Sequence, residues 1–194
     1  MNPRMIVIAG PPGSGKSTAF PVSSFGVAFF NADDRAAELN GGSYAGISQS
    51  IRQQVNREFE AFITGQIERR ESLAIETTLR SPVTFEQARL AKSQGFSIEM
   101  RYLALASFAM HLERVKARAD AGGHSASETT LRRIYQASLA NLPRALQEMD
   151  HLRVYDNTRP DFSAPVLLEA EAGVIRYLTP DPPAWLITAL PGIV

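Results

Sequence analysis

The 194-residue sequence contains no cysteine, which excludes a disulfide framework, a cysteine-based zinc site and a thiol nucleophile. Its three histidines, His111, His124 and His151, are too far apart for a zinc-binding helix motif, in which two histidines lie one turn apart. Long apolar runs are also missing, since no stretch approaches the roughly 20 residues that span a bilayer. A zinc enzyme and a disulfide-stapled secreted module are therefore excluded, and no membrane partner is expected.

Charge of a single sign is not in excess either, because 20 basic residues are matched by 20 acidic ones. Domains that bind a nucleic-acid backbone usually carry a large basic excess, so the neutral balance disfavours a nucleic-acid partner. The N-terminal residues lack the long apolar region and the small-residue cleavage site of a signal peptide. We therefore expect a cytoplasmic protein. Lysine is scarce, and the lysines are Lys16, Lys92 and Lys116, against 17 arginines.

Short apolar runs alternate with segments of helical period, which predicts a three-layer α/β fold around a mainly parallel sheet of five strands. The first run, residues 5–9, is continuous and ends at a glycine, as a buried parallel strand would. Pro21 falls inside the helix that follows and should shorten or bend it. The other predicted strands are residues 27–30, 73–75, 98–105 and 152–155.

The intervals between these strands have the pattern of helices. Apolar residues recur every three or four positions over residues 47–67, which predicts a long helix with one apolar stripe. Ser81 and Pro82 suit the N-cap and first position of a helix that runs to about Ser93, and Ser107 suits the cap of the next helix. The last predicted helix runs from a capping box at Ser125 and Glu128 to Met149, with a kink at Pro143.

The pattern changes after residue 157. Residues 166–170 and 174–178 flank a short turn, which predicts a β-hairpin at the edge of the sheet. The proline-rich tail follows, and Trp185 and Leu186 are expected to pin it to the body of the protein. We predict one domain over residues 1–194, with the hairpin and tail at about 164–194.

The segment after the first predicted strand satisfies the phosphate-loop pattern Gly-x4-Gly-Lys-Ser/Thr and lies between a strand and a helix, the context that supports this motif. The glycines let successive backbone N–H groups surround phosphate oxygens, and the helix N-terminus adds positive potential. Lys16 would bridge the β- and γ-phosphates and Ser17 would ligate Mg²⁺. The residues expected to hold the nucleotide are Gly10, Pro11, Pro12, Gly13, Ser14, Gly15, Lys16, Ser17 and Thr18.

The rest of the chain distinguishes between the classes of phosphate-loop protein. A GTPase would carry Asn-Lys-x-Asp for guanine recognition, and that motif is absent. A motor ATPase usually ends its second catalytic strand in Asp or Asp-Glu, whereas here a single Glu76 is followed by Thr77 and Thr78. The sequence therefore favours a small-molecule kinase that uses ATP and Mg²⁺.

Two acidic positions at predicted strand ends are candidates for chemistry. Asp33 follows the second strand, where it could accept a proton from an acceptor hydroxyl; the alternative is that it caps the next helix. Its neighbour Asp34 is interpreted as a helix-start or solvated residue. Glu76 should lie beside the phosphate loop and orient Mg²⁺-bound water or the acceptor hydroxyl. Arg80 could clamp an anionic substrate or be an ordinary surface residue.

Residues 114–133 carry five basic side chains and two acidic ones. Gly122 and Gly123 form a candidate hinge between two pairs of arginines, and kinases of this architecture close such a segment over ATP. The sequence thus predicts a lid at about residues 119–127; the alternative is a solvated helix face. His124 would contact a phosphate or merely hold the loop. The arginine pairs are Arg114 with Arg118 and Arg132 with Arg133, of which Arg118 and Arg133 are the candidate catalytic residues.

Taken together, these segments resemble the zeta-toxin family of phosphate-loop kinases. The matching pieces span roughly residues 5–158 in the family's order, and as a set they are far more specific than the phosphate loop alone. They comprise residues 10–18, 30–33, 76–80, 95–96, 114–118, 122–124, 132–135 and 155–157.

The resemblance implies ATP-dependent phosphorylation of a sugar-nucleotide hydroxyl, with the sugar 3′-hydroxyl of UDP-N-acetylglucosamine as the family's known acceptor. It also implies an antitoxin partner encoded elsewhere. A kinase for another small hydroxyl substrate, or a nucleotide-binding regulatory module without phosphotransfer, remains the alternative. By this analogy Asp33 is the base, and Arg118 and Arg133 stabilise the transferring phosphoryl group. Lys16 and Ser17 hold ATP and Mg²⁺, with Glu76 as a second metal residue. The residues that face the substrate are Glu76, Thr77, Thr78 and Arg80, and those near the adenine or the lid base are Asp156 and Asn157.

Overall fold

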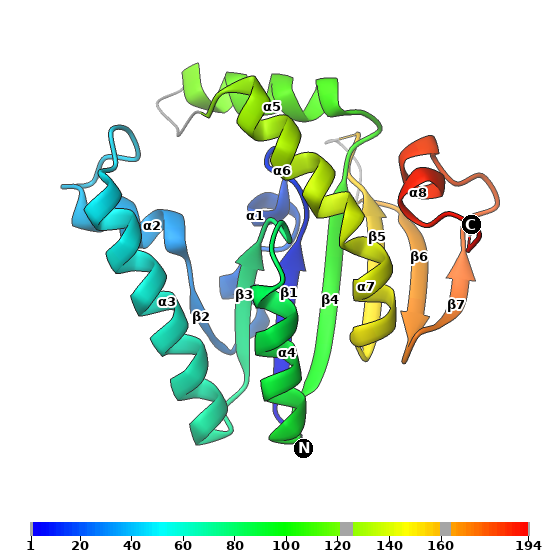
Figure 1. The fold of residues 1–194 in the computed structure, drawn as a ribbon, viewed down its shortest axis with the longest axis horizontal. Helices are drawn as coiled ribbons and strands as arrows, with labels where there is room; N and C mark the ends of the chain where they lie inside the picture. The colour runs from blue at the N-terminus through cyan, green and yellow to red at the C-terminus, as the bar shows by residue number, and fades with distance from the viewer. Residues whose placement is uncertain (1, 121–125, 160–163, 194) are drawn as a thin grey trace.

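The computed structural model describes residues 2–120, 126–159 and 164–193, which form one sheet with helices packed against it (Figure 1). The strand order is β2-β3-β1-β4-β5-β6-β7. The strands are β1 (Arg4–Ala9), β2 (Ala28–Phe30), β3 (Leu73–Thr77), β4 (Ser97–Ala104), β5 (His151–Asp156), β6 (Val166–Glu171) and β7 (Val174–Leu178).

The five strands predicted from the apolar runs are parallel, which confirms the expected core of the sheet. The predicted hairpin is also present: β6 pairs antiparallel with β5 and then with β7, so the hairpin extends the same sheet to seven strands. Strand β1 lies between β3 and β4, and its register aligns Ile8 with Glu76 and Ala9 with Thr77. Because parallel strands end at the same edge, the ends of β1 and β3 lie side by side.

One face of the sheet is covered by helices α3 (Gln49–Arg69), α4 (Val83–Ser93), α7 (Leu142–Glu148) and α8 (Ala184–Ala189) (Figure 1). Alternate residues of β1, among them Met5 and Val7, face this main core. Trp185 and Leu186 of α8 are buried in it, which confirms that they pin the tail.

The opposite face has a smaller core, built on Ile6 and Ile8 of β1. Among the described residues, the helices that cover it are short: α1 (Lys16–Ala19) and the 3₁₀ helix η1 (Val22–Phe25), which lie behind the sheet in Figure 1. As predicted, Pro21 shortens the first helix, which ends before it. The remaining helices are α2 (Ala32–Leu39), α5 (Phe108–Asp120) and α6 (Glu128–Ala140).

Three predictions about helix boundaries were wrong. Helix α4 begins at Val83 with Pro82 as its N-cap residue and without a side-chain cap, so Ser81 is not the cap. Ser127 caps α6 by accepting a hydrogen bond from the Thr130 N–H, which makes Glu128 the first residue of the helix instead of the third. Ser125, the expected cap, lies outside the described residues.

The third correction concerns the long helix expected to kink at Pro143. It is two helices, α6 and α7, separated at Asn141. A proline has no N–H to donate, and in the first turn of α7 none is needed, so a new helix start accommodates it better than a kink. By contrast, Ser107 does precede α5 as predicted and accepts a hydrogen bond from the Met110 N–H at 3.4 Å. Within the described residues, no helix is both long and apolar enough to span a bilayer.

Candidate functional site

The phosphate loop, residues 10–18, connects the end of β1 to α1 and depends on glycine for its shape. Gly13 and Gly15 have positive φ angles of 79° and 83°, a region that L-residues with a side chain rarely adopt. A Cβ on Gly13 would also lie 2.6 Å from the carbonyl oxygen of His111, and one on Gly15 would collide with the side-chain amide of Asn157. The loop therefore packs tightly against its neighbours, and its shape requires glycine at both positions.

Lys16 is the buried cation of this loop. Its Nζ donates to the carbonyl oxygens of Gly10 at 3.0 Å and Pro11 at 3.3 Å, and it lies 3.7 Å from Glu76 Oε1. Burial lowers the pKa of Lys16, and the charge of Arg118 lowers it further, while Glu76 and Asp33 raise it. Three of the predicted site residues, on β3, α2 and α5, thus act electrostatically on this ammonium group.

Ser17 and Glu76 form an oxygen-rich pair beside Lys16, because Ser17 Oγ donates to Glu76 Oε2 at 2.9 Å. Hydroxyl and carboxylate oxygens are the ligands that Mg²⁺ prefers, and this cation is usually held by one or two protein groups together with phosphate oxygens. No group of three metal-ligating residues occurs among residues 2–120, 126–159 and 164–193. The pair therefore fits a magnesium ion that is shared with a bound nucleotide.

Asp33 and Asp34 occupy the first turn of α2, which follows β2. Asn31 caps this helix, since its Oδ1 accepts from the Asp33 N–H at 3.1 Å and from the Asp34 N–H at 3.2 Å. The alternative that Asp33 is the cap is thus wrong. The Asp34 carboxylate is engaged by Asn31 Nδ2 at 2.6 Å and by the Tyr44 hydroxyl at 2.8 Å. Both aspartates are exposed, and Asp33 is the one whose charge acts on Lys16.

The residues after β3 lie at the same edge of the sheet as the phosphate loop. The Thr77 hydroxyl accepts from the Leu79 N–H at 3.1 Å and pairs with the Thr84 hydroxyl at 3.3 Å, which shapes the turn into α4. Thr78 is half-buried and Arg80 is exposed. The structure therefore brings Glu76 directly to the loop, and it places Thr77, Thr78 and Arg80 just beyond it.

The four arginines on either side of the predicted lid differ in their contacts. Arg114 donates to the Thr158 carbonyl at 3.0 Å, and Arg132 pairs with Glu128 at 2.9 Å while its guanidinium lies 4.2 Å from the centre of the Phe108 ring. Arg118 on α5 and Arg133 on α6 are exposed. The hinge glycines Gly122 and Gly123 and His124 lie outside the described residues.

The two residues expected near the adenine or the lid base both make hydrogen bonds to backbone groups. Asn157 Nδ2 donates to the Ser14 carbonyl of the phosphate loop at 2.8 Å, and this side chain is buried. Asp156 Oδ1 accepts from the Thr158 N–H at 2.8 Å. Asn157, which directly follows β5, therefore supports the phosphate loop. A contact of Asp156 or Asn157 with a nucleotide stays a prediction.

His111 is a residue of the site that the sequence did not reveal. It lies on α5, is 2% exposed, and has its Nδ1 2.9 Å from the carbonyl oxygen of Pro12 in the phosphate loop. Its Nε2 accepts a hydrogen bond from the Leu105 N–H at 3.0 Å. Burial lowers the pKa of His111 to about 4, and the charges of Lys16 and Arg114 add to this effect.

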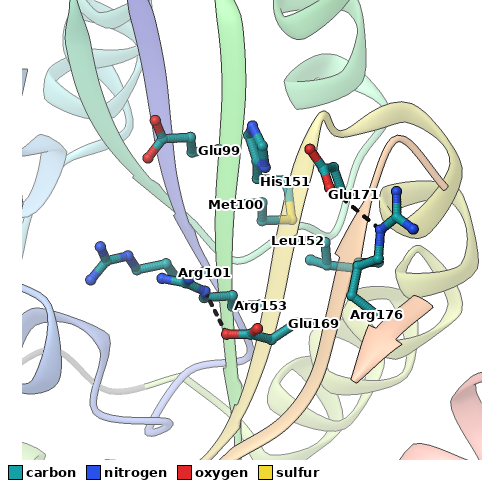
Figure 2. Close-up of a pocket in the computed structure, with 10 residues that line it drawn as sticks. Glu99, Met100, Arg101, His151, Leu152, Arg153, Glu169, Glu171 and Arg176 are labelled. Carbon is teal, nitrogen blue, oxygen red and sulfur yellow. Dashed lines mark ion pairs between the residues drawn. The ribbon is translucent and has the colours of Figure 1, made fainter. Parts of the chain in front are cut away.

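A groove of about 410 Å³ lies where β4 and β5 begin, on the face of the sheet opposite the main core (Figure 2). We call this part of the sheet surface, which is lined by residues such as Glu99, His151 and Arg176, the bare face. The phosphate loop follows the opposite, carboxyl end of the parallel strands. Charged side chains in the groove pair with one another: Arg153 lies 2.8 Å from Glu169, and Arg176 lies 3.4 Å from Glu171 (Figure 2). These pairs form a mutually neutralised, solvated face that is separate from the candidate site.

Comparisons with known proteins agree with this geometry. Residues 5–140 match the AAA domain family, whereas none of the curated proteins matches the sequence. A candidate kinase from Chloroflexus aurantiacus has a TM-score of 0.61 at 17% identity, over 83% of this chain and 91% of its own. A structure of the PezAT chromosomal toxin-antitoxin system of Streptococcus pneumoniae has a TM-score of 0.64 at 16% identity, over 87% of this chain and 71% of its own.

A third similar structure is AvrRxo1-ORF1:-ORF2 with ATP, which has a TM-score of 0.68 at 14% identity. The match covers 90% of this chain and 60% of that one, so this chain spans less than two thirds of its length. At such identities the likeness concerns the fold alone, which is the α/β phosphate-loop kinase fold with a mostly parallel sheet and a C-terminal antiparallel hairpin.

Proposed function

The chain belongs to the AAA domain family, and from this premise we propose that it is an ATP-dependent kinase for a hydroxyl group of a small molecule. The observation that carries the proposal is the environment of Lys16. A buried ammonium in the phosphate loop is acted on by a strand-end carboxylate, Glu76, by the exposed carboxylate of Asp33 and by Arg118 from α5. Phosphoryl transfer needs a phosphate-binding cation, a proton acceptor and a charge-stabilising arginine, and these residues supply all three.

The phosphate loop would bind the nucleotide through its backbone N–H groups, and Lys16 would turn from the loop carbonyls to the β- and γ-phosphates. Ser17 and Glu76 would hold Mg²⁺, which when bound neutralises charge on the phosphates. Residues 1–194 would act as one domain. Asp156 and Asn157 would lie near the adenine.

Asp33 would serve as the base. It would accept the proton of the acceptor hydroxyl while the oxygen forms a bond to the γ-phosphorus and the bond from that phosphorus to the bridging oxygen breaks, leaving ADP. Its exposed carboxylate supports this role, since the neighbouring Asp34 is already engaged by Asn31 and Tyr44.

Arg118 and Arg133 would approach the transferring phosphoryl group from helices α5 and α6, which flank a lid at about residues 119–127. Both arginines are exposed, whereas Arg114 donates to the Thr158 carbonyl and Arg132 pairs with Glu128, which supports the choice of one arginine within each pair. Planar guanidinium groups bind phosphoryl oxygens with two parallel hydrogen bonds and stabilise the charge that spreads over them. Closure of the lid would also exclude water, which would otherwise compete with the acceptor.

A sugar nucleotide such as UDP-N-acetylglucosamine is the acceptor we favour, because of the resemblance to zeta toxins. Glu76, Thr77, Thr78 and Arg80 would contact it, with Arg80 positioned to meet an anionic diphosphate. The resemblance also suggests an antitoxin partner, and one of the similar structures is described as a toxin-antitoxin system.

Product analysis after incubation with ATP, Mg²⁺ and a panel of UDP-sugars tests the proposal. A phosphorylated sugar would support it, and phosphate transfer to a different hydroxyl compound would replace the acceptor while preserving the kinase. Bare hydrolysis, or ATP binding without transfer, would favour a nucleotide-dependent regulatory module instead. Lys16→Ala serves as the negative control, because it removes the cation of the loop and should abolish nucleotide binding.

A further inference from the structure

The hydrogen bonds of His111 define its tautomer. The Leu105 N–H can only donate, so the Nε2 atom that it contacts at 3.0 Å must be an acceptor without a proton. The ring proton of the neutral histidine is therefore on Nδ1, and it is donated to the carbonyl oxygen of Pro12 at 2.9 Å. His111 thus joins the end of β4 to the phosphate loop through one ring.

This contact orients a phosphate-binding amide. In a trans peptide the N–H of one residue points opposite to the carbonyl of the residue before it, and none of the described peptide bonds is cis. When His111 holds the Pro12 carbonyl, the Gly13 N–H must point away from His111. Asn157 has the same effect one step further on, because it holds the Ser14 carbonyl and so directs the Gly15 N–H.

The two amides are available to a ligand. Within residues 2–120, 126–159 and 164–193, neither the Gly13 nor the Gly15 N–H donates a hydrogen bond to the protein. A row of free N–H groups aimed to one side is the arrangement that binds phosphate oxygens. The side chains behind the loop therefore set the direction of the donors in front of it.

His111 also links the two helices that flank the predicted lid, because it is part of α5 and contacts α6. It belongs to α5, whose backbone lies against Gly13, and its ring packs at 5.2 Å, edge to face, against Tyr135 of α6. Arg118 follows on α5 and Arg133 precedes Tyr135 on α6. A change in the loop carbonyl at Pro12 would therefore alter the contacts that His111 makes near the start of α5 and at the middle of α6.

We propose that His111 is a positioning residue that holds the phosphate loop in its nucleotide-binding conformation and ties that conformation to helices α5 and α6. The proposal rests on the nucleotide function given above. Without the bond to Pro12, the peptide between Pro12 and Gly13 can rotate, and only the fraction of molecules with the amide turned inward binds phosphate. The apparent dissociation constant then rises in inverse proportion to that fraction.

Two substitutions separate the two hydrogen bonds of the ring. The side-chain amide nitrogen of asparagine reaches about the position of Nδ1, so His111→Asn keeps a donor for Pro12 and leaves the buried Leu105 N–H without its partner. The longer glutamine places an oxygen near Nε2, so His111→Gln keeps the acceptor for Leu105 and withdraws the donor from Pro12. His151→Asn is the matched control, because His151 is exposed in the groove of the bare face.

The experiment is calorimetric titration of each variant with Mg²⁺ and adenylyl imidodiphosphate, a non-hydrolysable ATP analogue. We expect His111→Gln to weaken binding about tenfold or more, the effect of one unsatisfied, partly buried carbonyl, and His111→Asn to stay within about threefold of the wild type. His111→Gln should raise KM for ATP and leave kcat within about twofold, whereas a merely structural loss of folded protein would lower kcat and leave KM unchanged. Wild-type affinity in His111→Gln would overturn the proposal.

Two further outcomes are informative. If neither the wild type nor His151→Asn binds the analogue, the nucleotide function itself fails, and the role of His111 fails with it. The wild-type protein provides a test that does not depend on the variants folding: ¹⁵N NMR of the imidazole should show a protonated Nδ1 and an unprotonated Nε2 near neutral pH. The opposite tautomer would overturn the proposal.

Discussion

Ser17 Oγ and Glu76 Oε2 lie 2.9 Å apart, although 59 residues separate them in the chain. The other oxygen of the same carboxylate lies 3.7 Å from Lys16 Nζ. The parallel pairing of β1 with β3 produces this arrangement, since it ends both strands at the same edge and aligns Ile8 with Glu76. Within the part of the chain that the structure describes, Glu76 is thus the one carboxylate that contacts both the hydroxyl and the ammonium group of the phosphate loop.

Glu76→Gln should raise the Mg²⁺ concentration needed for half-maximal activity by about tenfold or more. Glutamine keeps the shape of the side chain and can still accept from Ser17, but it removes the negative charge that a magnesium ion needs. The measurement is a magnesium titration at saturating ATP. Glu169→Gln is the control, because it removes a carboxylate that is paired with Arg153 on the bare face. Equal magnesium dependence of Glu76→Gln and the wild type would contradict the assignment.

Asp33→Asn should bind ATP as the wild type does and lose about 10²- to 10⁴-fold in kcat, the usual contribution of a general base. Asp34→Asn is a matched control one position along the same helix turn, with its side chain held by Asn31 and Tyr44. Single-turnover transfer and nucleotide binding should be measured on both variants. Full phosphoryl transfer by Asp33→Asn would remove Asp33 from its role, and a loss confined to Asp34→Asn would exchange the two carboxylates.

Arg133→Ala should lower kcat about 100-fold or more while Arg132→Ala stays within about threefold of the wild type. The two arginines are adjacent and exposed on α6, but the guanidinium of Arg132 is paired with Glu128 and stacked on Phe108, whereas within the described residues the Arg133 side chain has no such contact. A guanidinium that stabilises a transferring phosphoryl group accounts for effects of this size or larger. Steady-state kinetics with both variants decides between them, and equal losses would mean that α6 contributes general positive charge and not one specific residue.

The parallel sheet and the phosphate loop were predictable because both are encoded locally. A continuous apolar run such as residues 5–9 indicates a buried strand from its own composition, and the glycine pattern that follows it is specific in that context. The position of Glu76 could be inferred in turn, since parallel strands end at one edge. These predictions used nothing beyond neighbouring residues and the order of strands.

The supports of the loop could not be predicted in this way. His111 reaches Pro12 across 99 residues and Asn157 reaches Ser14 across 143, and no spacing in the sequence indicates such pairs. The prediction of the α6 cap was wrong for a different reason. Ser125 and Ser127 are two residues apart and each is a suitable N-cap residue, so the sequence pattern alone cannot choose between them. The break at Asn141 depends on a tertiary contact, because its side chain donates to the Leu79 carbonyl at 2.8 Å.

Acid should destabilise the fold through His111. Burial lowers the pKa of His111 from the usual 6.5 to about 4, with the charges of Lys16 and Arg114 adding to this effect and the hydrogen bond to Pro12 opposing it. Tyr135 of α6 packs against the ring. Below 6.5 the unfolded chain binds a proton that the folded protein does not, so this stability is complete above pH 6.5 and is lost as the pH falls toward 4. The loss between pH 7 and pH 5 should be about 2 kcal/mol in the free energy of unfolding, measured by urea denaturation at each pH.

His111→Asn cannot titrate at this position and should show a correspondingly smaller change over the same range, with His151→Asn behaving like the wild type. An equal change in wild type and His111→Asn would mean that other groups cause the acid sensitivity and that the buried ring titrates alike in the folded and unfolded chains.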